Sequence, residues 1–283
     1  MGFSFASHTF FNCSMGIYLI SFVGYLVFVV LKNKKLGSFS TGLLLVGFIL
    51  HSVGLVLRWT ETHQTGYGYV PLSNMYESLV FFSWTIVLIY LILEFKYQQK
   101  AIGLFATPLA FLTIAVTSII PGISPKITPL MPALQSNWLA IHVITCFLGY
   151  ASFAVSFGIS ILYLFKENQE GKEGWKWLPS PVLLDEMNYK SIVIGFPMLT
   201  LGIVTGAAWA NYAWGGYWSW DPKETWSLIT WFVYAAFLHA RLIRDWRGRK
   251  AAILSIAGFI AVLFTYFGVN YLISGLHSYA MAS

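Results

Sequence analysis

Tryptophan and histidine are the residues of this chain whose types and positions could support chemistry. Six of the 12 tryptophans fall between residues 209 and 231, where even spacing would place about one. The run WGGYWSWDPKETW contains four of them, Trp214, Trp218, Trp220 and Trp226. An aromatic belt at a membrane interface explains single tryptophans, but it explains poorly a group of indoles interrupted by two glycines. We expect this run to form an apolar surface beside water that a flat amphipathic ligand could cover.

Two histidines are predicted to lie on the same side of a membrane as this run. His142 follows Trp138 by four residues inside an apolar segment, which is about 6 Å along a helix. His277 lies five residues beyond the last apolar segment. Imidazole is a ligand for transition metals and for haem iron. The pair beside an indole surface favours a bis-histidine haem site, and the alternative is that both are ordinary interfacial side chains.

Asp221 has a structural interpretation that is compatible with a role in the site. In the sequence DPKE, Asp221 can cap a helix, Pro222 can be its first residue and Glu224 can complete a capping box. A second capping box is suggested by Asn74 and Glu77 in PLSNMYES. Glu77 could then face the site from near the outer surface.

His239 is predicted to lie near the opposite face of the membrane. It follows Lys223 by 16 residues, or about 24 Å of helix in a hydrocarbon core about 30 Å thick. An ionisable group at that depth usually faces a bundle interior or a ligand. His51 lies at a different depth and is a poor partner for it. Either another subunit supplies the second histidine, or His239 is only hydrogen-bonded.

The elements that must position these residues are membrane helices. The chain is 57% hydrophobic and 10% charged, against about 45–50% and about 25% in soluble domains, which excludes a soluble globular fold. Eight segments reach the roughly 20 apolar residues that cross a bilayer, at 15–31, 39–57, 73–93, 101–120, 138–165, 191–210, 223–243 and 251–272. We predict an all-α polytopic membrane protein, one membrane domain over residues 1–283, with the tryptophan loop at about 209–226.

The basic residues predict the orientation of these helices. Of the 17 lysines and arginines, 14 fall in the odd-numbered connections, and only Arg58, Lys126 and Lys223 fall on the other side. The positive-inside rule therefore places both termini and the tryptophan run on the outer side, periplasmic or lumenal. The long connection 166–190 is expected to be solvated and cytoplasmic. Short basic clusters between apolar segments indicate membrane orientation and not nucleic-acid binding.

The tryptophan run resembles the WWD signature of membrane haem-handling proteins of cytochrome c assembly, in particular the System II branch known as the CcsA/ResC family. The run WGGYWSWDPKETW fits that signature without a departure. Three further segments look like other motifs of the branch, PLSNMYES, PALQSNWLAIHV and GLHSYA. The resemblance covers most of the chain from about residue 58 onward.

The resemblance implies roles for individual residues. His142 and His277 match the outer pair of histidines that ligate haem iron, and His239 matches a membrane histidine that holds haem on its way out. The residues of the signature that would contact haem are Trp214, Trp218, Trp220, Asp221 and Trp226. The second membrane histidine belongs to a CcsB/ResB-type partner, so we expect this chain alone not to be a complete synthase.

These observations predict a component of a holocytochrome c synthase (cytochrome c haem lyase). It would export haem b and present it for covalent attachment to the CxxCH motif of apocytochrome c, in contact with membrane lipid and with no nucleophile of its own. The expected location is a bacterial inner membrane or a thylakoid membrane. The alternatives are a bis-histidine cytochrome b-type electron-transfer subunit and an aromatic-lined transporter that binds no haem. Cys13 and Cys146 form no haem-attachment motif.

Overall fold

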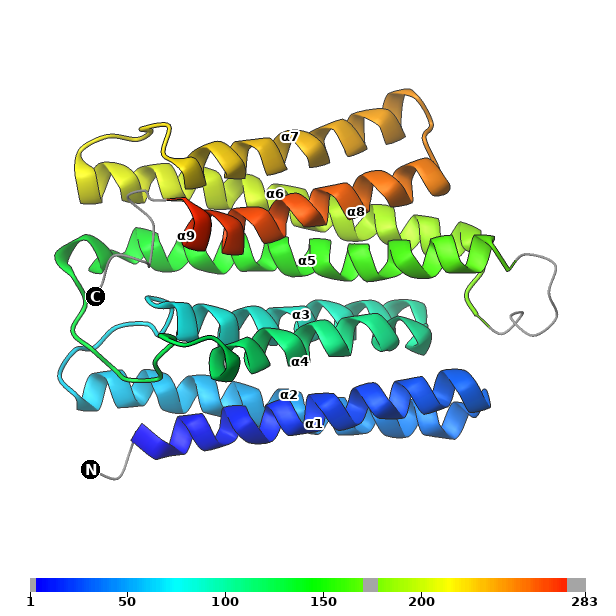
Figure 1. Cartoon of the computed structure of the whole chain (residues 1–283), viewed down its shortest axis with the longest axis horizontal. Helices are drawn as coiled ribbons and strands as arrows, with labels where there is room; N and C mark the ends of the chain where they lie inside the picture. The colour runs from blue at the N-terminus through cyan, green and yellow to red at the C-terminus, as the bar shows by residue number, and fades with distance from the viewer. Residues whose placement is uncertain (1–3, 170–177, 274–283) are drawn as a thin grey trace. The chain divides into compact units, whose positions relative to one another are not determined.

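A computed structural model of the chain describes residues 4–169 and 178–273. Within these ranges every regular element is helical, and eight helical segments are long and apolar enough to cross a membrane (Figure 1). The all-α fold class and the expected number of helices able to span a membrane are confirmed. The main helices are α1 (Ser4–Leu31), α2 (Lys34–Gln64), α3 (Met75–Tyr97), α4 (Gly103–Ile119), α5 (Asn137–Glu167), α6 (Pro181–Trp214), α7 (Pro222–Ile243) and α8 (Arg249–Leu263).

Shorter helices complete these elements. The 3₁₀ turn η1 (Lys100–Ile102) leads into α4, and η2 (Pro132–Leu134) precedes α5. After α8 the chain continues through a π-helical turn, η4 (Phe264–Gly268), into α9 (Val269–Leu272). Residue contacts divide the chain into two compact units, Met1–Gln135 and Ser136–Ser283. A single membrane domain over residues 1–283 stays a prediction.

The first unit contains α1 to α4, and buried carboxylates join its helices. α1 packs against α2 and α4, and α3 packs against α4. Glu94 of α3 is 2% exposed and accepts hydrogen bonds from Tyr25 of α1, Thr41 of α2 and Lys100 of η1. A charge inside a membrane bundle is tolerated when it is paired and hydrogen-bonded. Glu94 therefore fixes how four elements of this unit meet.

The helix α2 extends beyond its predicted end at residue 57, because polar residues of its last two turns are buried and paired. Arg58 lies 3.0 Å from Glu77 of α3, and both side chains are buried. Asn74 caps α3 by accepting the Glu77 N–H at 2.9 Å. The Glu77 carboxylate accepts from Ser73 and Arg58, so this capping box forms on one side only. Glu77 is thus engaged inside the first unit.

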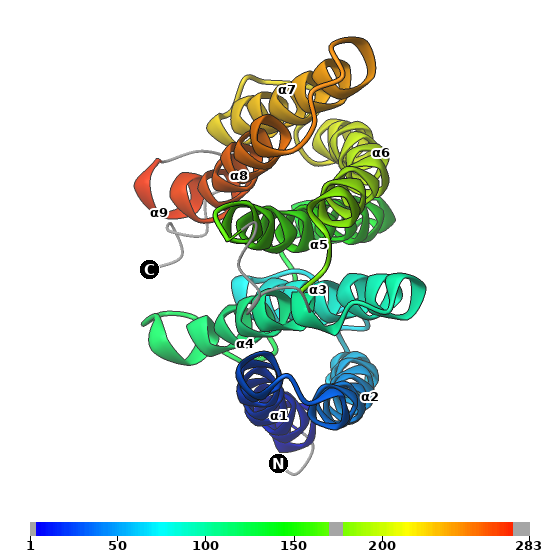
Figure 2. The same ribbon diagram turned by 90° about the vertical axis from the view of Figure 1, so that its right-hand side faces the viewer.

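The second unit contains α5 to α9 and carries the predicted site residues that the structure describes. α5 packs against α6 and α8, and α7 packs against α6 and α8, so the four helices form a closed ring (Figure 2). α6 begins at Pro181, ten residues earlier than predicted, because Ser180 caps it and Asp185 pairs with Arg241 at 2.6 Å. The expectation that all of 166–190 is a solvated connection is therefore wrong for its last ten residues.

Candidate functional site

The tryptophan loop is shorter than the sequence predicts, because α6 continues as far as Trp214. Gly215 ends α6 with φ of +77°, a left-handed conformation that glycine adopts without strain. Trp220 adopts a positive φ of 59° and is 68% exposed. A non-glycine residue in that conformation is strained, and such strain is concentrated at functional sites. The loop therefore holds one large indole outward at a conformational cost.

Glu224 organises the loop from the first turn of α7. The predicted capping box is confirmed, with Asp221 accepting the Lys223 N–H at 2.8 Å and Glu224 accepting the Asp221 N–H at 3.2 Å. The same Glu224 oxygen also accepts from the backbone and hydroxyl of Ser219. One carboxylate thus fixes the segment that contains Trp220 relative to α7.

Indole rings line this end of the second unit at several levels. Trp218 and Trp220 meet edge to face, with ring centroids 5.8 Å apart. The Trp218 ring nitrogen is buried and has no hydrogen-bond partner among the described residues. Trp226 lies below the loop and packs against Phe264 at 4.1 Å between centroids. The loop indoles and Trp226 therefore lie near the same end of the second unit, and their forming one apolar surface stays a prediction.

His142 lies in the second turn of α5, and its ring is held by α6. The ring nitrogen Nδ1 lies 2.7 Å from the carbonyl oxygen of Gly202. A carbonyl can only accept, so Nδ1 carries a proton, and in the neutral ring the lone pair is on Nε2. This tautomer coordinates iron in histidine-ligated haem proteins, where the other ring nitrogen donates to an outer partner. The contact with Gly202 is therefore compatible with the tautomer of an Nε2 ligand.

Three further neighbours fix the orientation of the His142 ring. Trp209 of α6 stacks on it with centroids 6.2 Å apart and an angle of 16° between the planes, and Trp214 in turn meets Trp209 at 4.9 Å. A Cβ atom at Gly206 would lie 2.6 Å from Nδ1. Cys146 lies one turn along α5, with its sulfur 3.7 Å from Nδ1. His142 is thus continuous with the tryptophan-rich end of α6.

At the same end of the second unit, Lys223 joins α7 to α9. Its ammonium group donates to Asn270 of α9 at 3.0 Å, which joins the start of α7 to the last described helix. Thr265 of η4 adds hydrogen bonds to Thr230 and to the Trp226 carbonyl oxygen. The helical segment formed by η4 and α9 is therefore anchored to the helix that follows the tryptophan loop.

The structure brings some predicted site residues together and separates another. His142 and Trp214 are linked through Trp209, and Trp218, Trp220 and Asp221 form one loop. His277 lies outside the described residues. His239 is exposed on the part of α7 remote from the loop. Its exposed face continues through Ile229, Phe232 and Ile243.

Comparisons with known proteins decide the family. Residues 72–277 match a family model described as cytochrome C assembly protein. The chain belongs to this family. Its relatives named cytochrome c biogenesis protein CcsA include those of Guillardia theta, 39% identical over 92% of each chain, and Microcystis aeruginosa, 39% identical over 86% of this chain and 87% of the relative. That of Heterosigma akashiwo is 43% identical over 75% of this chain and 77% of the relative. The predicted resemblance is confirmed.

A solved structure shows that the fold of this cytochrome c assembly protein recurs in a larger one. The chain named cytochrome c heme lyase CcmF superposes with a TM-score of 0.71 at 18% sequence identity. The match covers 94% of this chain and 47% of that chain. Our chain therefore spans about half the length of that neighbour, and the likeness concerns the fold.

Several residues that shape the site carry no signal in the sequence of this family member. Gly202 contributes only a carbonyl oxygen, and Gly206 contributes only the absence of a side chain. Trp209 was recognisable as part of the tryptophan cluster, but its stacking on His142 depends on how α5 and α6 pack. Periodicity along one helix could not have paired it with a residue 67 positions earlier.

Proposed function

We propose that this chain binds haem at the end of its second unit that carries the tryptophan loop, and presents it for covalent attachment to apocytochrome c. The observation that carries the proposal is the His142 ring, whose Nδ1 is bound to the Gly202 carbonyl and whose face stacks on Trp209. Membership of the cytochrome c assembly family, and relatives named for cytochrome c biogenesis, support it.

The chain's own residues would orient haem and would not react with it. His142 would give the iron one axial ligand through Nε2. The indoles of Trp214, Trp218 and Trp220 would cover the porphyrin face, and Trp226 would support them from below. In the attachment, each client thiol adds across a haem vinyl group, forming a carbon–sulfur bond while its proton passes to the other vinyl carbon. No nucleophile from this chain is needed for that step.

His277 is proposed as the second outer ligand. It follows the last described helix by only a few residues, and that helix is tied to Lys223 through Asn270. Two histidine ligands would keep haem bound until the histidine of the client CxxCH motif replaces one of them. The outer site would then release its cargo by ligand exchange.

His239 is proposed as an inner ligand that is completed by another protein. It is exposed on α7, in line with Phe232 and Ile243, so a helix of a membrane partner could pack on this face and bring its own histidine. The described part of the second unit contains no histidine other than His142 and His239. A CcsB/ResB-type partner is proposed for this role, in a bacterial inner or thylakoid membrane with the tryptophan loop facing the periplasm or lumen.

The deciding experiment replaces each outer histidine with glycine. His142→Gly and His277→Gly each leave a gap the size of imidazole beside the iron. Haem content and cytochrome c maturation should fall in both variants and recover in part with millimolar imidazole, as followed by absorption spectra of the complex purified with its partner. Normal maturation without added imidazole would refute the ligand assignment.

A further inference from the structure

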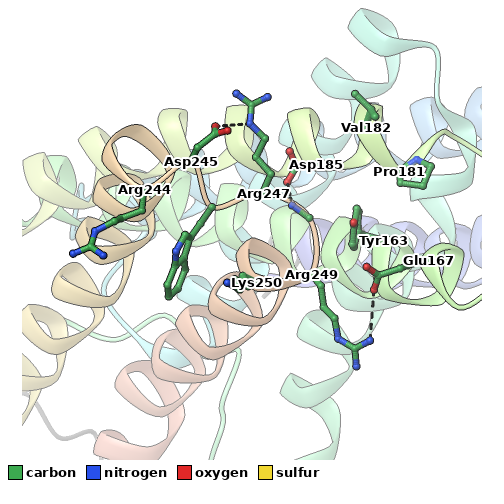
Figure 3. Close-up of a pocket in the computed structure, with 12 residues that line it drawn as sticks. Tyr163, Glu167, Pro181, Val182, Asp185, Arg244, Asp245, Arg247, Arg249 and Lys250 are labelled. Carbon is green, nitrogen blue, oxygen red and sulfur yellow. Dashed lines mark hydrogen bonds and ion pairs between the residues drawn. The ribbon is translucent and has the colours of Figure 1, made fainter.

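A cavity lies at the other end of the second unit, remote from the tryptophan loop. It has a volume of about 770 Å³, is open to the surface, and is bordered by the end of α5, the start of α6 and the turn between α7 and α8. This volume is within the range of about 300–1,000 Å³ typical of small-molecule sites. We call it the α7–α8 turn cavity, and Figure 3 shows the side chains that line it.

The turn that forms the cavity is held rigidly by α6 and α5. Asp185 is buried, and its two oxygens accept from the Gly248 N–H at 2.7 Å and from Arg241 at 2.6 Å. Gly248 has φ of +63°, and a Cβ atom there would lie 2.5 Å from the Tyr163 hydroxyl. The cavity is therefore a built feature of the fold, because a buried carboxylate and a glycine are needed to form its floor.

The charges around the cavity do not cancel. Asp185 is neutralised by Arg241, which lies outside the lining, and Asp245 pairs with Arg247 at 2.6 Å. Glu167 faces Arg249 at 3.8 Å. Figure 3 draws these last two pairs as dashed lines.

Two cations of the lining have no carboxylate partner among the described residues. Arg244 makes no ion pair there, and Lys250 lies over the Trp246 ring at 5.5 Å. The first turn of α8 begins at the cavity with no side-chain cap, so its free N–H groups add to the positive potential. The cavity is thus suited to an anion.

The lining also contains apolar side chains beside its charged ones, which favours an amphiphilic anion. At the start of α6, Val182 is 79% exposed and lies beside Pro181, and Trp246 in the α7–α8 turn is 40% exposed. Leu242 and Ile243 precede Arg244 and are also strongly exposed. A free phosphate would use the cations and leave these surfaces in contact with water. A lipid would contact the cations with its phosphate and cover the apolar side chains with its acyl chains.

We propose that the α7–α8 turn cavity binds the phosphate of an anionic phospholipid, with Arg244 and Lys250 as its cationic partners and with Val182 and Trp246 against the acyl chains. Basic pockets between membrane helices on the cytoplasmic side bind acidic headgroups in this way. The turn belongs to the strongly basic side of the chain, which the positive-inside rule assigns to the cytoplasmic leaflet.

Titration of the full purified chain in detergent with short-chain lipids tests the proposal. Dioctanoyl phosphatidylglycerol should bind saturably and at least about 10-fold more tightly than dioctanoyl phosphatidylcholine or inorganic phosphate in isothermal titration calorimetry. Arg244→Gln and Lys250→Gln should each weaken that binding about 5-fold, and the double variant about 25-fold. Equal affinity for inorganic phosphate would show a site for a free anion and overturn the proposal.

A matched control separates this cavity from general attraction to a basic surface. Lys96→Gln removes one exposed charge at the end of α3, where the ammonium lies over Tyr97 at 5.5 Å, and should leave the affinity unchanged. An equal loss in this variant would overturn the proposal. Val182→Asp provides an independent test, because it places a negative charge in the lining at an exposed position and should also abolish the preference for the anionic lipid.

Discussion

The ring of His142 is oriented by neighbours that bear no charge. A carbonyl oxygen of Gly202 fixes the tautomer, Trp209 covers one face, and Gly206 leaves room for the edge. An imidazole held from several directions loses little conformational freedom when it binds iron, which favours binding. The positioning residues around His142 should therefore matter almost as much as the ligand.

Gly206→Ala tests whether the residues that position the His142 ring affect haem binding, because it adds a single methyl group next to the ring. The new Cβ atom would lie 2.6 Å from Nδ1, so the ring must turn away from Gly202. Haem affinity should fall roughly 10-fold, the lower end of the loss seen for outer-shell changes at metal sites. The measurement is a haem titration followed by absorption.

The controls for Gly206→Ala separate displacement of the ring from helix damage. Gly42→Ala introduces the same methyl group into α2 at a position with nothing within 4 Å, and it should leave haem binding unchanged. In a chain that already carries His142→Gly, Gly206→Ala should cause no further loss of haem affinity. A full additional loss in that background would mean that Gly206 acts elsewhere.

Trp220→Gly separates the indole from the backbone conformation that carries it. Glycine adopts a φ of 59° without strain, so the loop should remain folded while its most exposed indole is lost. Haem should dissociate about 2-fold to 10-fold faster, the range expected for one aromatic contact. Stopped-flow transfer of haem to apomyoglobin measures the rate. Added imidazole should not reverse the effect, and a reversal would make Trp220 part of the ligand set.

At the scale of elements, the first turn of α7 both starts a helix and holds the tryptophan loop in place. Asp221 caps α7, and Glu224 fixes both Asp221 and Ser219. Asp221→Ala should lose about 1 kcal/mol of local stability. Amide exchange over the first turn of α7 should become about 5-fold faster by mass spectrometry. Asp221→Asn should keep its protection, because asparagine also caps helices, and equal exchange in both variants would contradict the capping role.

The sequence predicts this part of the structure well because its signals are local. The capping box of DPKE spans four residues, and the eight apolar segments need only length and composition. The start of α6 and the end of α2 could not be predicted, because Asp185 and Arg58 look like solvated charges until their partners Arg241 and Glu77 are known. The contacts of His142 with Gly202 and Trp209 could not be predicted either, because they depend on how α5 packs against α6.

At the scale of the whole molecule, orientation across the membrane remains to be measured. In a chain with the exposed Cys13 replaced by serine, a cysteine at Ser124 or Tyr217 should react with an impermeant maleimide from outside. A cysteine at Arg247, which is also exposed, should react only after permeabilisation. Cys146 is buried and can stay. The reverse pattern would invert the predicted topology.

The inner histidine can be tested only in the assembled complex. His239→Ala should lower the haem content of the chain purified with its partner, because one of two proposed ligands is lost. Phe232→Ala removes a side chain from the same exposed face of α7 and should retain the haem if partner contact is kept. The chain expressed alone should already lack this haem. Unchanged haem in the His239→Ala complex would reduce His239 to a surface residue.

The π-helical turn η4 gives the last described helix a rotational register of its own. A π turn contains one residue more than an α turn, and one residue corresponds to about 100° of rotation about the axis. If the same residues were wound as a plain α-helix, without the wider turn, Asn270 would lie about 100° around the axis, away from Lys223. The wider turn therefore sets the angle at which α9 presents Asn270 to Lys223.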